Sequence, residues 1–558
     1  MELTGAEILI EGLKSVGVKD IFGVSGSSLL RTMDVLYRTP EIRYVQSQHE
    51  GAAMYMANGY SRQSRGLGIC LVSPGPAETN CLSGVAQAFY TSTPAVLIAA
   101  VESSDNLGLG AAVHHDLDSP RIFAPVTKMA ARVERKDRLQ EFLQRTLVTA
   151  LGGRKGPCFL AIPTDFLREK AAVDQPGLRL CRPQPPRGNL HDIEAVAILL
   201  EEAKRPLLLA GGGINWSGAH QELLQLAELL GVPVAATKGH SGVFPEDHPL
   251  SLGTIQPAAS WPAMQTYYEA DLIVGIGCAF GYLAGSGFCS PVPKTARVVH
   301  IDIDATGIGN VIPVEAAVVG DARMVLQDLL EVLKDRGRAG GWPESQSEWS
   351  REVARRKADW AAHMAPLQNS SKVPIRTPRL LSDLRKALPR NAIVAAESGG
   401  TGSWFDHAFQ GLAPNSIGGW HPLGAEFCEA MGVKVASPEV PVVCLIGDGS
   451  MMMSLQEWAT AAANNIPVIC AVTHNGVFGN MRQTQIERFG SRFIGTDLPI
   501  PNFTNIAREF GAYAERVEDP ADIIPAVGRA LESRRLAVLE FMVDPSAENL
   551  HPPKYQPR

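Results

Sequence analysis

Residues 447–476 read GDGSMMMSLQEWATAAANNIPVICAVTHNG and place an acid and an amide at equivalent points of a strand–helix–strand pattern. Asp448 follows the apolar run PVVCLI, and Asn475 follows IPVICAVTH, one helix and one strand later. In an open parallel sheet, ligands bind beyond the carboxyl ends of the strands. We therefore expect both side chains at one edge of a parallel sheet, where they can act on the same ligand.

The residues around Asp448 predict the nature of that ligand. Gly447 and Gly449 let the backbone approach a phosphate closely, and SLQEWATAA offers a helix whose first N–H groups can face an anion. A carboxylate and an amide oxygen at one sheet edge suit a hard divalent cation, which also takes phosphate oxygens. A GDG turn alone is a weak signal, because any tight turn favours glycine. Its pairing with Asn475 predicts a magnesium diphosphate site.

The composition predicts a multidomain globular protein. A chain of 558 residues is too long for one hydrophobic core. With 51 Lys and Arg against 58 Asp and Glu, the formal charge is -7, and no basic cluster marks a nucleic-acid surface. Residues 1–18 read as an amphipathic helix without the pattern of a signal peptide, and no apolar run reaches membrane-spanning length. We expect a cytoplasmic protein with neither nucleic acid nor membrane as partner.

The nine cysteines are an odd number and are scattered along the chain without a CxxC spacing. Zinc sites and disulfide frameworks need regularly spaced or paired cysteines. The pattern therefore indicates reduced thiols, as in a cytoplasmic enzyme, and argues against both zinc and disulfides.

Apolar runs alternate with helical patterns along the chain, which is typical of parallel strands joined by helices. A Pro-rich segment (173–189) and a charged, Gly-rich segment (334–357), itself expected to contain a helix, interrupt this alternation. We expect an α/β fold of three doubly wound parallel-sheet domains. They would occupy residues 1–172, 190–333 and 376–558.

The GDG stretch resembles the fingerprint of thiamine-diphosphate-dependent enzymes of the acetolactate synthase, pyruvate decarboxylase and benzoylformate decarboxylase type. The overall pattern is closest to acetolactate synthase-like large subunits. The resemblance covers essentially the whole chain and implies pyrimidine-binding, central and diphosphate-binding domains in that order. It implies thiamine diphosphate and Mg²⁺ as cofactors, with Asp448, Asn475 and the carbonyl of Val477 as metal ligands. His474 replaces the first Asn of the pair that these enzymes usually carry.

The same resemblance implies further contacts to the cofactor. AAESGGTGSW would match the loop over the diphosphate, and HPLGAEF would place Leu423 under the cofactor as the apolar wedge that bends it. An ordinary core leucine is the competing interpretation for Leu423. The implied cofactor contacts are Ser398, Gly399, Gly400, Thr401, Leu423, Gly447, Asp448, Gly449, Ser450, Asn475, Val477 and Gly479.

Glu50 is the candidate for the carboxylate that activates the cofactor. In YVQSQHEGAAMYMANGYSR it follows a strand and begins a helix of small and apolar residues, which is unusual for a solvated glutamate. A carboxyl group near apolar rings has a raised pKa and can share a proton with a pyrimidine nitrogen. Family members carry the same HE-x-AA pattern. In such enzymes this glutamate and the diphosphate site come from different subunits, which implies a homodimer or homotetramer with active sites at the dimer interface.

The residues that select the reaction depart from the best-known relatives. His114 and His115 stand where acetolactate synthases usually have Phe-Gln, and they resemble the His-His pair of pyruvate decarboxylases. Histidine can move protons near neutral pH; a solvated loop pair is the competing interpretation. Ser27 resembles the serine of benzoylformate decarboxylases, and Met481 replaces a glutamate of pyruvate decarboxylases. The candidate substrate contacts are Ser25, Gly26, Ser27, His49 and Met481.

Several functions remain open on these residues. The leading one is decarboxylation of a 2-oxo acid with transfer of the acyl carbanion to a carbonyl acceptor, as in an acetolactate synthase-like carboligase. The alternatives are a decarboxylase that releases an aldehyde, a lyase that acts on a hydroxyketone or acyl-CoA, and a noncatalytic subunit. The intact Glu50, Asp448 and Asn475 argue against the last. Residues 279–281 replace the arginine of flavin-using relatives, so we favour a central domain without flavin, with FAD as the alternative.

Overall fold

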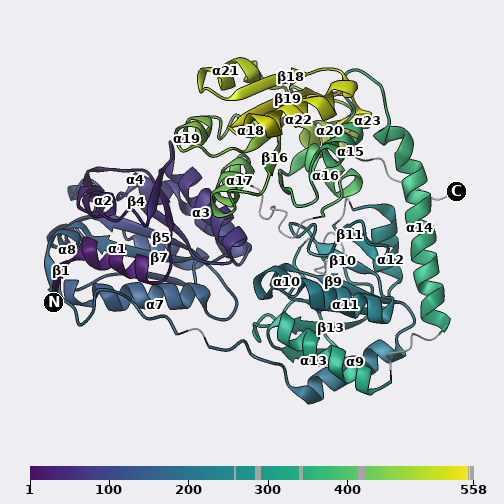
Figure 1. Cartoon of the computed structure of the whole chain (residues 1–558), viewed down its shortest axis with the longest axis horizontal. Helices are drawn as coiled ribbons and strands as arrows, with labels where there is room; N and C mark the ends of the chain where they lie inside the picture. Colours follow the sequence, from purple (N-terminus) through teal and green to yellow (C-terminus); the bar gives the residue numbers. More distant parts are fainter. Residues whose placement is uncertain are drawn as a thin grey trace.

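The computed structural model describes residues 1–181, 183–256, 259–282, 291–337, 344–412, 422–550 and 552. It contains three parallel β-sheets, each packed between helices on both faces (Figure 1). In Figure 1 the N-terminal lobe lies at the left, the central lobe at the lower right and the C-terminal lobe at the top. The predicted α/β class with three doubly wound parallel sheets is confirmed.

The N-terminal sheet has the strand order β3-β2-β4-β5-β7-β6 and is parallel throughout. Side chains alternate between two cores: Ile69 and Leu71 share one with α1 and α7, whereas Cys70 and Val72 share the other with α3 and α5. Both faces are buried, which explains the continuous apolar runs. The strands are β2 (Asp20–Gly23), β3 (Arg43–Gln46), β4 (Gly68–Val72), β5 (Ala95–Val101), β6 (Met129–Arg132) and β7 (Cys158–Pro163); the helices are α1 (Gly5–Ser15), α2 (Leu30–Tyr37), α3 (Glu50–Ser64), α4 (Pro76–Asn80), α5 (Leu82–Tyr90), α6 (Ser119–Phe123), α7 (Leu139–Leu151) and α8 (Thr164–Arg168).

The start of the chain differs from the predicted amphipathic helix over its first residues. β1 (Glu2–Thr4) pairs antiparallel with β8 (Lys170–Ala172), and α1 begins only at Gly5. The Oγ1 of Thr4 accepts the N–H of Glu7 at 3.3 Å, while the Glu7 carboxylate accepts the N–H of Thr4 at 2.8 Å. This reciprocal cap fixes the start of the helix. So short a strand leaves no periodic signal in the sequence.

The central sheet has the strand order β11-β10-β9-β12-β13-β14 and is also parallel. The chain builds outward in opposite directions from β9 and β12, so the loops after these two strands flank a crevice at the carboxyl edge. The strands are β9 (Pro206–Ala210), β10 (Val234–Thr237), β11 (Ser251–Ile255), β12 (Leu272–Ile276), β13 (Arg297–Asp302) and β14 (Ala316–Val319); the helices are α9 (Leu190–Glu202), α10 (Gly212–Ser217), α11 (His220–Leu230), α12 (Trp261–Glu269) and α13 (Ala322–Asp335).

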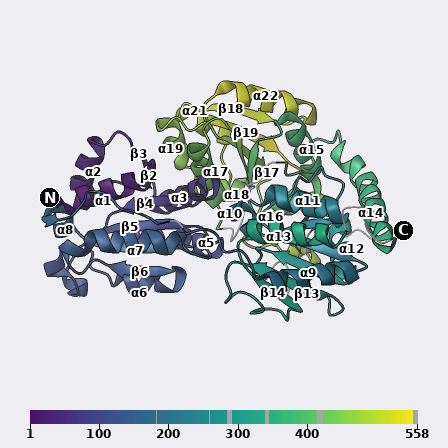
Figure 2. The same ribbon diagram turned by 60° about the horizontal axis from the view of Figure 1, so that its bottom comes forward.

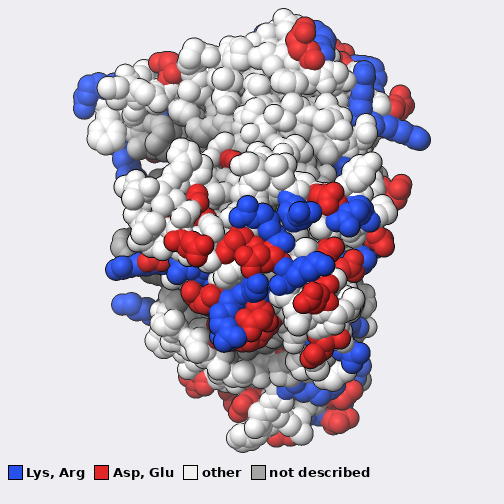
Figure 3. Space-filling model, turned by 90° about the vertical axis from the view of Figure 1, so that its left-hand side faces the viewer, with Lys and Arg blue, Asp and Glu red and all other residues white. Residues whose placement is uncertain are grey.

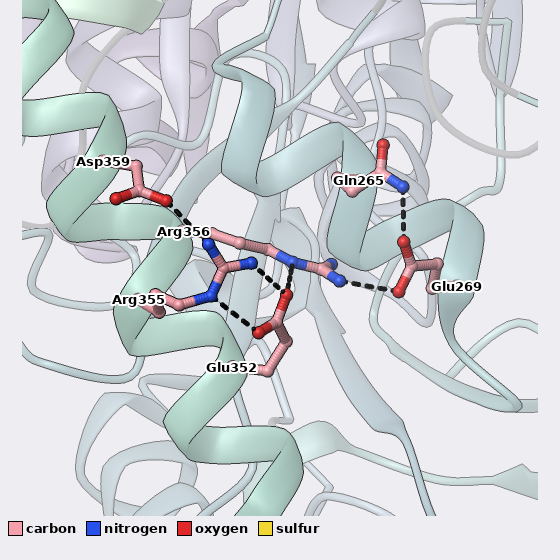
Figure 4. A network of polar contacts seen from close by, with 6 residues as sticks. All are labelled: Gln265, Glu269, Glu352, Arg355, Arg356 and Asp359. Atoms are coloured by element: carbon pink, nitrogen blue, oxygen red, sulfur yellow. Dashed lines mark hydrogen bonds and ion pairs between the residues drawn. The ribbon is translucent and has the colours of Figure 1, made fainter. Parts of the chain in front are cut away.

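The predicted linker after the central lobe contains one long helix, α14 (Glu344–Gln368), which runs along the right-hand edge in Figure 1. Arg356 fixes α14 to the central lobe, because its Nη2 donates to Glu269 of α12 at 2.7 Å and its Nε to Glu352 at 2.9 Å (Figure 4). Arg355 donates to the same Glu352 and, at 2.9 Å, to Asp359. The guanidinium of Arg356 is buried, so two carboxylate partners compensate its desolvation.

The C-terminal sheet has the strand order β15-β16-β17-β19-β18 and is parallel throughout. β16 and β17 are neighbours in register, with Gly447 opposite Thr473. Their carboxyl ends therefore meet at one edge. The strands are β15 (Ile393–Ala396), β16 (Val442–Gly447), β17 (Ile469–His474), β18 (Tyr513–Val517) and β19 (Ala537–Met542); the helices are α15 (Thr377–Ala387), α16 (Gly399–Ala408), α17 (Ala425–Ala436), α18 (Asp448–Met451), α19 (Glu457–Ala463), α20 (Gly479–Phe489), α21 (Phe503–Glu509), α22 (Ile523–Ser533) and α23 (Ala547–Leu550).

Helices α3 and α17 join the N-terminal and C-terminal lobes by packing backbone to backbone (Figures 1 and 2). A Cβ added at Gly59 would lie 2.1 Å from the carbonyl oxygen of Glu429, and one added at Gly432 would lie 2.0 Å from that of Met56. Only glycine permits this approach. Because residue 59 faces 429 and residue 56 faces 432, the two helices run antiparallel.

Figure 3 shows how charged side chains are distributed on one face of the molecule. On the face shown in Figure 3, which looks at the left-hand side of Figure 1, Lys and Arg lie among Asp and Glu in one mixed band. Such a mixture lacks the one-sign field of a nucleic-acid footprint. In the described part of the chain, every helix is too short or too polar to cross a bilayer.

Candidate functional site

Asp448 and Asn475 lie side by side at the carboxyl edge of the C-terminal sheet. The Oδ2 of Asp448 accepts the backbone N–H groups of Asn475 at 2.9 Å and Gly476 at 2.6 Å, and its Oδ1 accepts that of Gly449 at 2.7 Å. The Oδ1 of Asn475 accepts the N–H of Val477 at 3.0 Å. The in-register pairing of β16 and β17 thus brings the two ends of the 447–476 stretch into one loop cluster.

The donor set of this cluster fits a hard cation. Asp448 is buried, and burial raises its pKa while the three N–H groups and nearby His474 lower it in part. Asp448, Asn475 and the carbonyl of Val477 offer oxygen only, the donor type that Mg²⁺ prefers. A Cβ added at Gly447 would meet no atom within 4 Å, so there is open space beside the carboxylate.

Close packing requires glycine at position 449. A Cβ at this position would lie 2.6 Å from the ring of Phe478 and 2.7 Å from the side chain of Leu498. The residue is therefore glycine because the loop after β17 packs directly against it. Gly476 has a φ of 71°, a left-handed conformation that also favours glycine.

His474, which replaces the first Asn of the usual pair, is directed toward the neighbouring strand β19. Its Nδ1 lies 2.7 Å from the Oε1 of Glu540 on the neighbouring strand β19. Glu540 is fully buried; burial raises its pKa, but the bonds from His474 and Thr504 outweigh that effect and the net pKa is lowered. His474 and Glu540 therefore form a structural hydrogen-bonded pair next to the cluster.

The loop Ser398–Thr401 and Leu423 lie at the same edge and are tied together by Glu397. The carboxylate of this residue accepts the N–H of Ser398 at 3.3 Å and that of Gly424 at 3.2 Å. Thr401 adds a side-chain bond to Thr473 at 2.9 Å. Leu423 is 40% exposed, so it projects from the surface of this chain and is not a core leucine.

Glu397 has a second buried carboxyl group as its neighbour. Glu426, in the first turn of α17, is hydrogen-bonded to Glu397, and burial raises the pKa of Glu426 to about 8. Two buried carboxyl groups in contact share a proton, because two charges so close in a low dielectric repel strongly. The pair therefore holds a proton directly beneath the loop 398–401 and Gly424.

Glu50 lies at the carboxyl edge of the N-terminal sheet, in a cavity of about 920 Å³. It is half-buried and is the first residue of α3. Its Oε2 accepts the Nδ2 of Asn80 at 2.9 Å. The lining of the cavity includes Ser25, Gly26, Ser27, Glu50, His114 and His115.

The remaining predicted residues of this lobe have distinct positions. The rings of His114 and His115 lie with centroids 4.1 Å apart and are tilted by 40°, and His115 packs against Gly75. His49 caps α3, because its Nδ1 accepts the N–H of Gly51 at 3.0 Å, and it is not among the residues that line the cavity. Glu78 is buried and accepts the N–H of Gly75 at 2.7 Å, which makes it a structural cap.

Within one chain, the Glu50 cavity and the Asp448 cluster are separate. The antiparallel contact of α3 and α17 sets the start of α17 opposite residue 63, so Gly424 lies about 20 Å along α3 from Glu50 at 1.5 Å per residue. Gly424 itself packs on Ser450, in the Asp448 cluster. Met481, on α20, belongs to the same lobe and is 56% exposed.

The central lobe holds a cavity of about 410 Å³ at its switch point. The glycine-rich turns after β9 and β12 line it, with Asp302 from the end of β13 and Arg154 from the N-terminal lobe. Ala279 and Phe280 are also part of the lining. The central lobe therefore has a cavity with space for a ligand, although residues 279–281 argue against flavin.

Known proteins match the chain in the order of its three lobes. The N-terminal TPP binding domain of thiamine pyrophosphate enzymes matches residues 3–122, the central domain of these enzymes matches 193–329, and their C-terminal TPP binding domain matches 397–541. A protein described as a probable acetolactate synthase large subunit, from Methanocaldococcus jannaschii, is 32% identical over 98% of this chain and 92% of its own length. The chain belongs to the thiamine pyrophosphate enzyme family.

Further relatives in this family carry two different names. A probable acetolactate synthase large subunit of Methanococcus aeolicus is 30% identical, with 98% of this chain and 93% of the relative covered. A sulfoacetaldehyde acetyltransferase of Castellaniella defragrans is 29% identical, with 97% and 93% covered. The chain is thus an acetolactate synthase-like member of the thiamine pyrophosphate enzymes, and its family domains support thiamine diphosphate as the cofactor.

Three residues at the site escaped the sequence analysis. Asn80 is the last residue of α4, and nothing local in the sequence reveals that it contacts Glu50. Glu397 follows the apolar strand β15 at the same edge as Asp448, so the strand-end rule would have found it. Glu426 lies inside a helix, and only the tertiary contact with Glu397 distinguishes it.

Proposed function

We propose that this enzyme decarboxylates a 2-oxo acid and transfers the acyl unit to a carbonyl acceptor, with thiamine diphosphate and Mg²⁺ as cofactors. The observation that carries the proposal is the meeting of Asp448 and Asn475 at one sheet edge, beside the loop 398–401. Bound thiamine diphosphate supplies a nucleophilic carbon and takes up the electron pair left when CO₂ departs. The domain limits 1–172, 190–333 and 376–558 are part of the proposal.

In this proposal the C-terminal lobe holds the charged end of the cofactor. Asp448, Asn475 and the Val477 carbonyl would hold Mg²⁺, and the loop 398–401 would face the diphosphate. Gly447, Gly449, Ser450 and Gly479 would border it. The exposed side chain of Leu423 would support the cofactor from below. The hydrogen bonds that Glu397 accepts from Ser398 and Gly424 would keep both supporting segments in place.

In the N-terminal lobe, Glu50 would hold the proton that it exchanges with a pyrimidine nitrogen. Asn80 donates to its Oε2 and thereby orients the carboxyl group. Ser25, Gly26 and Ser27 would border the substrate, with His49 at the base of α3 and Met481 from the C-terminal lobe. The adjacent His114 and His115 would deliver or remove protons at the bound carbonyl.

A complete site would require a second copy of the chain. The distance of about 20 Å between Glu50 and Gly424, set by the length of α3, is too long for one small cofactor end to contact both. Leu423, Met452, Met453 and Met481 are exposed around the Asp448 cluster, as expected of a surface that a partner covers. A partner subunit on this surface would also bury Glu50. The assembly would be a homodimer or a homotetramer with its active sites between subunits.

The histidine pair favours a second candidate, a decarboxylase that releases an aldehyde. His114 and His115 line the same cavity as Glu50, where a proton donor would quench the acyl unit before an acceptor arrives. Neither reaction needs an external oxidant or reductant, so neither requires flavin. FAD in the cavity of about 410 Å³ is the alternative, and absorption near 450 nm in the purified protein would reveal it.

The test is to incubate the protein with thiamine diphosphate, Mg²⁺ and a panel of 2-oxo acids, with and without an aldehyde acceptor. We expect CO₂ release and a hydroxyketone product. Aldehyde as the sole product would favour the decarboxylase, and cleavage of a supplied hydroxyketone or acyl-CoA without use of any 2-oxo acid would favour a lyase. Absence of CO₂ from every acid would refute the proposal.

A matched pair of variants tests the role of Glu50. Glu50→Gln should lower kcat by about 10²–10⁴-fold, because it removes the proton transfer, and should leave Mg²⁺-dependent cofactor binding intact. Glu134→Gln changes an exposed glutamate of the same lobe and serves as the control. Full activity of Glu50→Gln would contradict the assigned role.

A further inference from the structure

Two arginines outside the predicted site line the same cavity as Glu50. Arg31 lies in the first turn of α2 and Arg168 at the end of α8, and these two helices pack together. Both side chains are exposed toward solvent in this chain. Two arginines from neighbouring helices therefore line one cavity of about 920 Å³.

The carboxylates next to these arginines are engaged with other groups. Asp34, one turn after Arg31, accepts Arg38 at 2.8 Å. Asp165, three residues before Arg168, accepts the N–H of Ser104 at 2.9 Å, and Glu169 accepts Lys136 at 2.6 Å.

Within the part of the chain that the structure describes, neither Arg31 nor Arg168 forms an ion pair. Glu50 and Glu102 are the carboxylates of the lining besides Asp34, and Glu50 is bonded to Asn80. Two unpaired guanidinium groups in one cavity repel each other, and an anion between them removes that repulsion. The planar fork of arginine matches carboxylate, sulfonate and phosphate oxygens.

The sheet topology separates Arg168 from Glu50 along the cavity, whereas Arg31 follows β2, the strand next to β3. Glu50 follows β3 and Arg168 follows β7, four strand positions apart in the order β3-β2-β4-β5-β7. At 4.7–4.9 Å per strand this is about 19 Å between backbone positions. The long side chains of Glu50 and Arg168 shorten the gap to the length of a small substrate. An anion held by Arg168 would thus lie at the opposite end of that substrate from the group next to Glu50.

We propose that Arg31 and Arg168 form an anion subsite that selects a substrate with a second anionic group, a carboxylate, sulfonate or phosphate, remote from its reacting carbonyl. This inference rests on the proposed function, because it assumes that the reacting carbonyl of the substrate lies next to Glu50. Ser25, Ser27 and Ser28 line the intervening stretch with hydroxyl groups, which suit a polar chain better than an apolar one. Arg31 and Arg168 are specificity residues in this scheme and take no part in proton transfer.

The test compares substrates of equal length that differ in one charge. With the full chain, thiamine diphosphate and Mg²⁺, 2-oxoglutarate is compared with 2-oxovalerate as donor. Aldehyde acceptors bearing a carboxylate, a sulfonate or a phosphate are compared with a neutral aldehyde. We expect kcat/KM to be at least about tenfold higher for one of the doubly anionic donors or anionic acceptors, since a charged hydrogen bond contributes 1.5–3 kcal/mol and 1.4 kcal/mol is tenfold. The anionic substrate with the higher kcat/KM identifies the anionic group that the subsite binds.

Variants assign the preference to the two arginines. Arg31→Gln and Arg168→Gln, singly and together, should raise KM for the preferred anionic substrate about tenfold or more and leave kcat and the kinetics of the neutral comparison substrate unchanged. Arg145→Gln, on the exposed face of α7, is the control. An unchanged ratio between the two substrates in the double variant would overturn the inference.

A binding measurement separates failure of this inference from failure of the proposed function. Calorimetric titration with 2-oxoglutarate, and with the three anionic aldehydes, does not depend on turnover. We expect one of them to bind about tenfold more tightly than its neutral counterpart and to lose that advantage in the double variant. Equal affinities would refute the subsite even if CO₂ is released. Absence of CO₂ together with selective anion binding would refute only the carboligase.

Discussion

The contact between α3 and α17 should fail when a single methyl group is added to it. In Gly432→Ala the new Cβ would lie 2.0 Å from the carbonyl oxygen of Met56 and close to the N–H of Tyr60. These are backbone atoms of a packed helix, so no side chain can rotate away and the helices must separate. Overpacking of this kind costs about 1–3 kcal/mol. We expect a value near the upper end, because the clash is with backbone.

The measurement is urea unfolding followed by circular dichroism, with Gly528→Ala as the control. Gly528 also lies inside a helix, α22, but a Cβ there would meet nothing within 4 Å. Gly528→Ala should therefore be neutral or stabilising by about 0.4–1 kcal/mol. If Gly432→Ala unfolded at the same urea concentration as Gly528→Ala, the close antiparallel contact, and the separation of Glu50 from Gly424 that follows from it, would be refuted.

Two further predictions concern buried carboxyl groups. The folded pKa of Glu426 is raised to about 8, above the value near 4.5 of an unfolded chain, so the native state binds the extra proton and stability should fall as pH rises from about 4.5 to 8. In Glu426→Gln this decrease should be smaller, as measured by thermal unfolding at pH 5 and pH 8; an unchanged slope would contradict the shared proton. His474→Asn restores the residue usual in relatives but leaves buried Glu540 without its partner, so it should cost about 1–3 kcal/mol. Cofactor affinity, measured by calorimetry, should not change in His474→Asn; a gain in affinity would show that His474 belongs to the metal site.

The parts of the structure that could be predicted from sequence rest on the geometry of parallel strands. Asp448 and Asn475 each follow an apolar run, and parallel neighbours bring such positions together without further information. Glu50 was expected at the start of a helix, and α3 begins at that residue. The three α/β domains followed from alternating apolar runs in the same way.

The remaining features depend on contacts that no local pattern contains. Gly59 and Gly432 look like weak points inside helices, and only the close approach of α3 to α17 explains them. His474 is an unexplained change next to Asn475 in the sequence, and its contact with Glu540 on the neighbouring strand explains it. Arg31 and Arg168 are ordinary surface arginines in the sequence. They become a candidate subsite only because α2 and α8 meet at one cavity.

Complementation between two inactive variants tests the central claim, that each active site is built from two copies of the chain. Glu50→Gln and Asp448→Ala are produced together with different affinity tags, and the mixed dimers are purified through both tags. In a mixed dimer one site has both defects and the other has none. We predict about half of the wild-type kcat per dimer, with each variant inactive alone. Mixed dimers as inactive as the separate variants would contradict the claim.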